Sequence, residues 1–462
     1  VAVNAVASAA SAKRNVLFVV VDDLNIDLGC YGNTRVVSPN IDRLAAGGAR
    51  FVRAYAQYPL CNPSRVSFLS GRRPENTGVY VLNTAPRTAM PDVVTLPQLF
   101  RQHGYFTAGV GKIFHSRGMN DPEAWDHFED GPGEDEQEKA AVAARYGGGD
   151  GRPRAHVLDG DGSRTRDGMH VAKVKQLLGE RAADQRPFFV ALGFHKPHLP
   201  WTAPKKYFDL YDARQLQPTP EPRMENIPAI ALQTELSGFP QPDSVAEAIR
   251  GYYACVSFID DLLGSVMTEL ERLKLAESTT IVFFSDHGFH LGDHGGLWAK
   301  LSAFDRATRV PLLMAGAGVP RGRVVEAPVE LLDVFPTVAE LAGLPLPPKL
   351  DGMSLVPALR GERLERSAAS MVFHYDVTAR RDVLSRTIIA QDGRYTEWDQ
   401  GQAGREYYAH ATDPGEYRNR SSDPTVQAQV KRAQQALAEL PTPKPGPANR
   451  PRALDPTAKK KQ

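Results

Sequence analysis

The chain has 462 residues, enough for a large hydrophobic core and more than one compact unit. Its 55 Lys and Arg residues nearly balance 54 Asp and Glu residues, so no overall field attracts a polyanion and nucleic-acid binding has no support from charge. No apolar run is long enough to span a bilayer, so a membrane-spanning protein is not predicted.

The first 14 residues are rich in Ala, Ser and Val and begin without Met. This composition is typical of the cleavage end of a signal peptide whose front is missing, and equally of a disordered terminus. Under the first interpretation the protein is periplasmic or secreted. Three cysteines, Cys30, Cys61 and Cys255, are too few for a disulfide framework, and their odd number leaves at least one sulfur for another role.

Short apolar runs rich in β-branched residues recur along the chain, at residues 15–21, 188–193, 280–285 and 310–314. They predict buried parallel strands, and segments with helical periodicity, such as residues 256–273 and 329–341, lie among them. This alternation predicts an α/β fold with a mostly parallel sheet sandwiched by helices. The first run ends in Asp22 and Asp23, and open α/β sheets bind ligands at such carboxyl ends.

The pattern changes towards the C-terminus. We predict a main domain over residues 15–360 and a smaller α+β domain over residues 361–440, with an antiparallel sheet built from short segments such as 385–390 and 394–398. Residues 129–168 are dense in Gly, Asp, Glu and Arg, which predicts a long surface insertion. Residues 441–462 are rich in Pro, Lys and Ala and are predicted to be a disordered tail.

The strongest chemical signal is the sequence Cys-Asn-Pro-Ser-Arg at residues 61–65, followed by Gly-Arg-Arg at residues 71–73. Cys61 stands just before a segment with helical character, and both a helix amino terminus and the nearby Arg65 favour an anion there. The alternative is a small buried cysteine, which is how most lone cysteines behave.

This pentapeptide resembles the signature of the sulfatases, in which the cysteine is oxidised to formylglycine. From about residue 15 to residue 419, further stretches resemble the iduronate-2-sulfatase branch of that family, within the alkaline-phosphatase-like superfamily. They are Leu-Gly-Cys-Tyr-Gly at 28–32, Ser-Pro-Asn-Ile-Asp-Arg-Leu at 38–44, Gly-Lys-Ile-Phe-His at 111–115, Gly-Phe-His-Lys-Pro-His at 193–198, Ser-Asp-His-Gly at 285–288, Trp-Ala-Lys at 298–300 and Asp-Pro-Gly-Glu at 413–416. One short motif can mislead, whereas this ordered set is highly specific.

The resemblance implies a sulfuric ester hydrolase that acts on a sulfated sugar, with one calcium ion and a formylglycine made from Cys61. Carboxylate oxygens suit a hard cation such as calcium, although imidazole is an unusual ligand for it. The resembled branch nevertheless has an Asp-His pair at this point of the sequence. The implied metal ligands are Asp22, Asp23, modified Cys61, Asp286 and His287.

The remaining site residues also follow from the resemblance. Arg65, Lys112 and Lys300 resemble the groups that bind the sulfate and stabilise the aldehyde. Lys112 and Lys300 have apolar sequence neighbours, which favours burial over the usual solvated position of a lysine. His115 and His195 resemble the two catalytic histidines. His198 is expected either to contact the substrate or to support a residue that does, and Lys112, His195 and Lys300 are expected to contact the substrate.

The implied mechanism uses the two hydroxyls of hydrated formylglycine. One hydroxyl, activated by the metal, attacks the sulfur of the ester, while Arg65, Lys112 and Lys300 balance charge on the sulfate oxygens. His195 protonates the leaving alcohol, and His115 then deprotonates the second hydroxyl, which expels sulfate. The implied partners are a sulfated saccharide substrate and a formylglycine-generating maturation enzyme.

Two other functions stay open on the sequence. A phosphodiesterase or phosphonate monoester hydrolase of the same superfamily is the first, although the Asp-His pair at residues 286–287 and the stretch at 193–198 favour a sulfatase. A calcium-stabilised glycan-binding protein without activity is the second, and the intact set of Cys61, Lys112, His115 and His195 argues against it. The loops at residues 129–168 and 201–222 are expected to determine the substrate.

Overall fold

A computed structural model describes residues 14–130, 136–143, 154–184, 186–216, 220–235, 237, 241–376 and 379–444. The predicted signal remnant or disordered start (residues 1–14) and the predicted disordered tail (residues 441–462) lie almost wholly outside these residues. The domain limits at residues 360 and 440 stay predictions.

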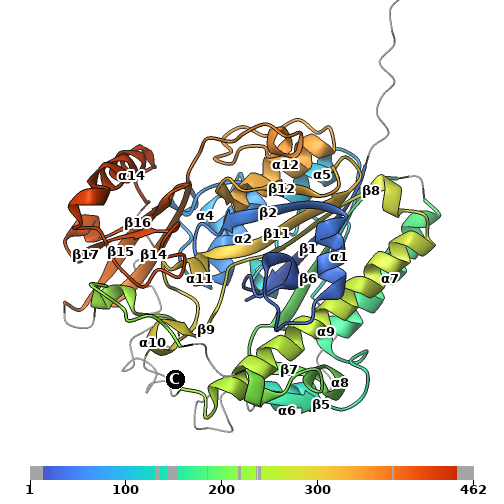
Figure 1. Cartoon of the computed structure of the whole chain (residues 1–462). Coiled ribbons are helices and arrows are strands. Elements are labelled where there is room, and N and C mark those ends of the chain that lie inside the picture. The colour runs from blue at the N-terminus through green and yellow to red at the C-terminus, as the bar shows by residue number, and fades with distance from the viewer. Residues whose placement is uncertain are drawn as a thin grey trace, which may run out of the picture.

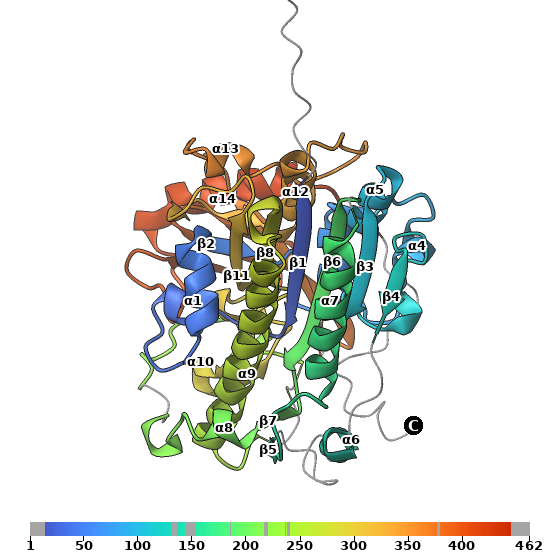
Figure 2. The same ribbon diagram turned by 90° about the vertical axis from the view of Figure 1, so that its right-hand side faces the viewer.

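A large sheet forms the centre of the molecule (Figures 1 and 2). Within the described residues it has nine strands in the order β12-β2-β11-β8-β1-β6-β3-β4, with β13 paired to β2. Their bounds are β1 Asn15–Asp22, β2 Gly48–Tyr55, β3 Phe106–Gly111, β4 His127–Glu129, β6 Phe188–Pro197, β8 Thr279–Ser285, β11 Arg309–Gly316, β12 Arg323–Val325 and β13 Val329–Glu330.

The strands from β8 through β1, β6 and β3 to β4 run parallel, which confirms the expected α/β fold with a mostly parallel sheet. The expectation that residues 310–314 form a parallel strand is wrong, because β11 runs antiparallel to both of its neighbours, β2 and β8. An apolar run reports burial on both faces of a strand, and it carries no information on the direction in which the strand runs.

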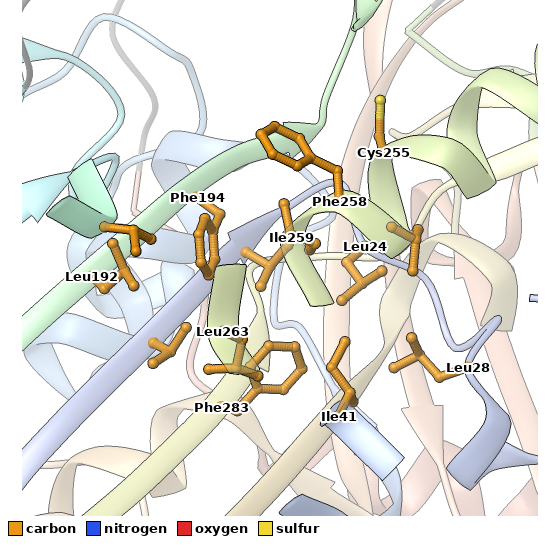
Figure 3. Close-up of a cluster of buried hydrophobic side chains, with 14 of the residues drawn as sticks. Leu24, Leu28, Ile41, Leu192, Phe194, Cys255, Phe258, Ile259, Leu263 and Phe283 are labelled. Atoms are coloured by element: carbon orange, nitrogen blue, oxygen red, sulfur yellow. The ribbon is translucent and has the colours of Figure 1, made fainter. Parts of the chain in front are cut away.

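Helices cover both faces of the sheet because successive side chains of a strand point to opposite faces. Leu17, Val19 and Val21 of β1 pack with the layer of α1 (Pro39–Ala46), α7 (Arg166–Ala182) and α9 (Val245–Arg272). The alternate residues of β1 pack with the layer of α2 (Cys61–Ser70), α5 (Leu96–Gln102) and α12 (Val334–Leu341). Figure 3 shows Ile259 and Leu263 of α9 near Phe194 of β6 and Phe283 of β8.

Several segments differ from their predicted limits. The helix expected at residues 256–273 begins earlier, at Val245, where the Ser244 side chain caps the helix by accepting a hydrogen bond from the backbone N–H of Glu247. Residues 329–341 contain β13 and a 3-10 turn before α12. The predicted insertion at residues 129–168 contains the short elements α6 (Glu136–Ala143) and β5 (Ala155–Leu158) and the first turn of α7.

The expected small antiparallel sheet near the C-terminus is confirmed. It consists of β14 (Ala368–Asp376), β15 (Arg381–Ile389), β16 (Gly393–Trp398) and β17 (Gly404–Ala409). Helix α14 (Gln427–Glu439) covers it, with Val430 and Leu437 packed against Ile388 and Tyr407. Glu330 of β13 joins the two sheets by accepting hydrogen bonds from Arg73, Arg366 and the backbone N–H of Ala369.

Short elements connect these layers. The strands are β7 (Trp201–Pro204), β9 (His290–Gly292) and β10 (Leu297–Ala299), and the helices are α3 (Pro74–Thr77), α4 (Pro86–Ala89), α8 (Lys205–Phe208), α10 (Asp293–Gly296), α11 (Asp305–Thr308) and α13 (Val356–Leu359). In the part of the chain that the structure describes, every helix is too short or too polar to cross a membrane.

Gly193 allows the close approach of β6 to the backbone after β3, because a Cβ atom there would lie 2.2 Å from the backbone carbon of Lys112. Gly193→Ala should therefore lower the free energy of unfolding by about 1–3 kcal/mol, measured by urea denaturation. Gly179 is the control: it lies inside α7 with nothing within 4 Å of an added Cβ, so Gly179→Ala should raise stability by about 0.5–1 kcal/mol. Equal effects of the two changes would contradict the tight approach at Gly193.

Candidate functional site

All of the predicted site residues lie at one edge of the large sheet. The parallel strands β1, β3, β6 and β8 end at this edge, and the segment after β10 returns to it, as does the start of α2. From these elements come Asp22 (the end of β1) and Asp23 (after β1), Cys61 and Arg65 (α2), Lys112 and His115 (after β3), His195 (β6) and His198 (after β6), Asp286 and His287 (after β8), and Lys300 (after β10).

The backbone is strained at Asp23 and on both sides of Lys300. Asp23, directly after β1, has a φ of 64°, and the two neighbours of Lys300, Ala299 and Leu301, have φ values of 72° and 62°. Non-glycine residues rarely adopt this left-handed conformation, and it persists where the surrounding structure determines it. The bend lets the consecutive carboxylates of Asp22 and Asp23 both reach the site, although successive residues of a regular strand point to opposite faces.

Cys61 lies at the centre of the site and is 1% exposed. Its Sγ atom is 3.4 Å from Oδ1 of Asp22, 3.4 Å from Nε2 of His287 and 3.3 Å from Nζ of Lys300. Cys61 is also the first residue of α2, so the backbone N–H groups and the positive end of the helix dipole lie beside it. This position favours negative charge on the side chain or on a group bound next to it.

Arg65, one turn further along α2, is completely buried. Its Nε atom donates to Oδ2 of Asp286 at 2.9 Å, and Nη1 donates to the backbone carbonyls of Lys112 and Ile113, the latter at 3.1 Å. The Nη2 atom lies 3.6 Å from Oδ1 of Asp22 but has no hydrogen-bond partner. A buried donor without a partner is costly, which is evidence for a bound group that completes this site.

Two buried lysines neutralise the carboxylates at the end of β1. Lys112 donates to Oδ2 of Asp22, and Lys300 donates to Oδ1 of Asp23 at 2.6 Å. Burial alone would raise the pKa of Asp22, but the charges of Lys112, His198 and Arg65 outweigh it and hold that pKa well below its usual value. Asp22 is therefore a carboxylate at neutral pH.

The same residues form a cluster with the donor atoms that a metal ion needs. One oxygen each of Asp22 and Asp286, Sγ of Cys61 and a ring nitrogen of His287 all lie within 4.8 Å of one another. Asp23 and His198 form an overlapping group with Cys61. The five predicted metal ligands thus lie close together. His198 brings a further ring nitrogen near them, since its Nε2 atom lies 3.9 Å from Oδ2 of Asp23.

A pocket of about 250 Å³ opens beside this cluster. His115 and His195 line it, and burial lowers the pKa of each, to about 3 for His115 with a contribution from Lys112 and to about 4 for His195. Both imidazoles are therefore neutral at neutral pH in the free protein. The lining residues are Lys112, His115, Ser116, Asp130, Glu138, Arg166, His195, Lys196, His198, Leu199 and Pro200.

Sequence reasoning missed the residues that surround His195. Asp167 accepts hydrogen bonds from the backbone N–H groups of His195 (2.8 Å) and Lys196 (2.9 Å), and Nη1 of Arg166 lies 3.0 Å from Nε2 of His195. Both residues lie in the first turn of α7, inside the segment predicted as a surface insertion. The signal for this helix was Thr165, whose side chain accepts a hydrogen bond from the backbone N–H of Gly168 and caps it.

A mostly parallel sheet, with buried carboxylates and a cysteine at the start of a helix at one edge, fits the alkaline-phosphatase-like fold. The sulfatase family profile matches residues 14–344, and a second profile, described as N-sulphoglucosamine sulphohydrolase, C-terminal, matches residues 292–442. The chain belongs to the sulfatase family and is a sulfuric ester hydrolase.

Individual relatives agree with this assignment. The chain is 36% identical to mouse iduronate 2-sulfatase over 74% of this chain and 71% of the relative, and 33% identical to a sulfatase of Formosa agariphila over 89% and 83%. Among solved structures, the phosphonate monoester hydrolase of Agrobacterium radiobacter superposes with a TM-score of 0.74 at 22% identity, covering 92% of this chain and 95% of that one. A likeness at this identity shows the fold alone.

Proposed function

We propose that this sulfatase removes sulfate from a sulfated sugar, in the manner of iduronate 2-sulfatase, and that it uses a formylglycine made from Cys61. The observation that carries the proposal is the position of Cys61, buried at the start of α2 between Asp22, His287 and Lys300. A nucleophile at this position would have beside it the charged groups that stabilise a reaction at a sulfate ester. Its conversion requires a maturation enzyme as a partner.

We propose one calcium ion as the cofactor. The carboxylates of Asp22, Asp23 and Asp286 are almost completely buried, and clustered carboxylate oxygens suit a hard cation. His287 and the modified residue 61 complete the proposed ligand set. When bound, the cation and the hydrated aldehyde at residue 61 supply charge neutralisation and an oxygen nucleophile with a second hydroxyl that allows sulfate to be expelled.

Arg65, Lys112 and Lys300 are the proposed groups that hold the sulfate. The two lysine ammonium groups lie 4.0 Å and 3.3 Å from Sγ of Cys61, the atom that marks the reacting position. Nη2 of Arg65 is a donor without a partner in the same cluster. These cations are fixed before substrate binds, which is the arrangement that stabilises charge developing in a transition state.

His115 and His195 are proposed to move protons on the two sides of the reaction. His115 is neutral and its Nδ1 atom has no hydrogen-bond partner, so this imidazole is able to accept a proton as a general base. His195 is proposed to protonate the leaving alcohol. A bound sulfate ester adds negative charge next to His195, which favours its protonated form. His198, beside Asp23 and the pocket, is the proposed additional substrate contact.

Hydrolysis of phosphonate esters is the less supported alternative. The similarity to a phosphonate monoester hydrolase is 22% and concerns the fold, whereas relatives above 30% identity carry sulfatase names. We propose further that the protein works in the periplasm or is secreted, as an Ala- and Ser-rich start suggests.

The proposed function is tested first at Cys61. Cys61→Ala should abolish hydrolysis of 4-nitrophenyl sulfate while the protein stays folded, because the substitution removes the precursor of the nucleophile and little volume. Peptide mass mapping of the wild-type protein should find residue 61 in the aldehyde form. Cys30→Ala, which changes a half-buried cysteine distant in sequence from the signature, is the matched control and should keep activity. Full activity of Cys61→Ala would exclude the formylglycine.

The metal prediction has a readout other than activity. Calcium added to chelator-treated protein should raise the free energy of unfolding by about 2.7 kcal/mol at a hundredfold excess over its Kd. Asp286→Asn should abolish this gain, and Asp209→Asn, at an exposed carboxylate paired with Lys205, should retain it. Calcium-dependent stabilisation that survives Asp286→Asn would place the ion elsewhere.

The proposed roles of His195 and His115 are distinguished by comparing substrates with different leaving groups. A sugar alkoxide needs a proton as its bond to sulfur breaks, whereas nitrophenolate hardly does. His195→Ala should therefore reduce single-turnover alcohol release from a sugar sulfate by about 10²–10⁴-fold, and far less from 4-nitrophenyl sulfate. His115→Ala should slow steady-state turnover of both, since the step it assists follows departure of the alcohol. Equal losses for His195→Ala on both substrates would remove it from the acid role.

A further inference from the structure

The main chain around Lys300 is held by hydrogen bonds from other segments. The carbonyl of Lys300 accepts a hydrogen bond from the backbone N–H of Glu235 at 2.8 Å. The N–H of Leu301 donates to the carbonyl of Pro59 at 3.1 Å, two residues before Cys61. Leu301 is in the left-handed conformation, which persists where the surrounding structure imposes it. The position of the Lys300 ammonium group therefore depends on the residues that bind this segment.

The carbonyl of Leu301 is bound by His374, a residue of β14 in the small sheet. His374 is 1% exposed, and its Nε2 atom lies 2.5 Å from the carbonyl oxygen of Leu301. Its Nδ1 atom lies 2.8 Å from the carbonyl oxygen of Ile230, in the 3-10 turn Ala229–Ala231. A carbonyl oxygen only accepts hydrogen bonds, and a neutral imidazole has a single N–H, so the neutral ring binds one of the two. The doubly protonated ring binds both.

Burial sets the pH range in which this ring changes charge. It lowers the pKa of His374 from its usual value, and the two carbonyls oppose this effect because they favour the charged form. The ring centroid lies 4.7 Å from that of Trp398, whose Nε1 atom donates to Glu406 at 2.6 Å. Among the described residues, Glu406 and Lys300 included, no charged side chain contributes to the shift. The second hydrogen bond is therefore present in acidic solution and is lost as the pH rises through this pKa.

Both carbonyls belong to segments that lead to Lys300. Leu301 follows Lys300 directly in the chain. Ile230 stands shortly before Glu235, whose backbone N–H binds the carbonyl of Lys300 and whose carboxylate lies 3.7 Å from the Lys300 ammonium group. Whichever carbonyl the neutral ring releases, the loss loosens a segment that fixes Lys300.

We propose that His374 is a positioning residue for Lys300: its doubly protonated ring holds both segments, and loss of one proton weakens the grip of Lys300 on the sulfate group. This inference rests on the proposed role of Lys300 in holding sulfate. It links sulfate binding to pH through a residue of the small sheet, in addition to any titration of His115 and His195.

His374→Gln tests the proposal because the Gln amide keeps a donor near the place of Nε2, for Leu301, but does not titrate and leaves Ile230 without a donor. Wild-type kcat/KM for 4-nitrophenyl sulfate, divided by that of His374→Gln, should fall by about 10-fold between about pH 4 and about pH 8, the weight of one hydrogen bond to a charged group. Both proteins contain the same catalytic histidines, so the titration of those residues cancels in the ratio.

NMR of the imidazole groups provides a readout other than activity. The resonances of His374, assigned by their absence from His374→Gln, should show two ring N–H groups in acidic solution and one at neutral pH. His103→Gln is the matched control: Nδ1 of His103 also lies 2.8 Å from a backbone carbonyl, that of Leu99, but His103 precedes β3, at the sheet edge opposite to the site. Its activity ratio to wild type should not change with pH.

An activity ratio for His374→Gln that is the same at every pH overturns the inference, because a purely structural residue would lower activity equally throughout. A His374 ring with an unchanged number of protons overturns it as well. His374→Asn, which keeps a donor for Ile230 instead, provides the comparison if His374→Gln does not fold. Wild-type protein that fails to hydrolyse 4-nitrophenyl sulfate at any pH contradicts the proposed function instead, so the two failures are distinguishable.

Discussion

The structure of the site depends on the mutual neutralisation of buried carboxylates and buried cations around Cys61. Asp22, Asp23 and Asp286 face Arg65, Lys112 and Lys300, and loss of one partner from such a set costs about 3–5 kcal/mol because it leaves a charge buried without compensation. Each of these segments is therefore constrained by the others, because moving one charged side chain away would leave its partner buried without compensation.

The parallel sheet brings these buried carboxylates and cations to the same place. Its central strands end at one edge, so carboxylates after β1 and β8 meet cations after β3 without long loops. Close approach of β3 and β6 requires glycine: Gly111 has a φ of 81°, and a Cβ on either Gly111 or Gly193 would meet the backbone of the opposite strand. The left-handed residues around Lys300 add a turn that brings its ammonium group back to Cys61.

The side of the site near Cys61 and the side near His195 differ in how much buried charge they contain. On the side of Cys61, buried ion pairs fix Arg65, Lys112 and Lys300, which suits recognition of an unchanging sulfate group. On the side of His195, the first turn of α7 places a half-buried arginine beside the neutral imidazole of His195 in β6.

The sequence alone determined the family, the apolar strands and the residues around Cys61, because the ordered motifs and the runs of β-branched residues are local patterns. It did not determine the antiparallel direction of β11 or the early start of α9, since burial and periodicity do not encode direction or exact ends. Nor did it point to Arg166 and Asp167 in a segment predicted as an insertion. Only the tertiary structure places them on His195, because that contact joins residues 28 and 29 positions apart through the packing of α7 against β6.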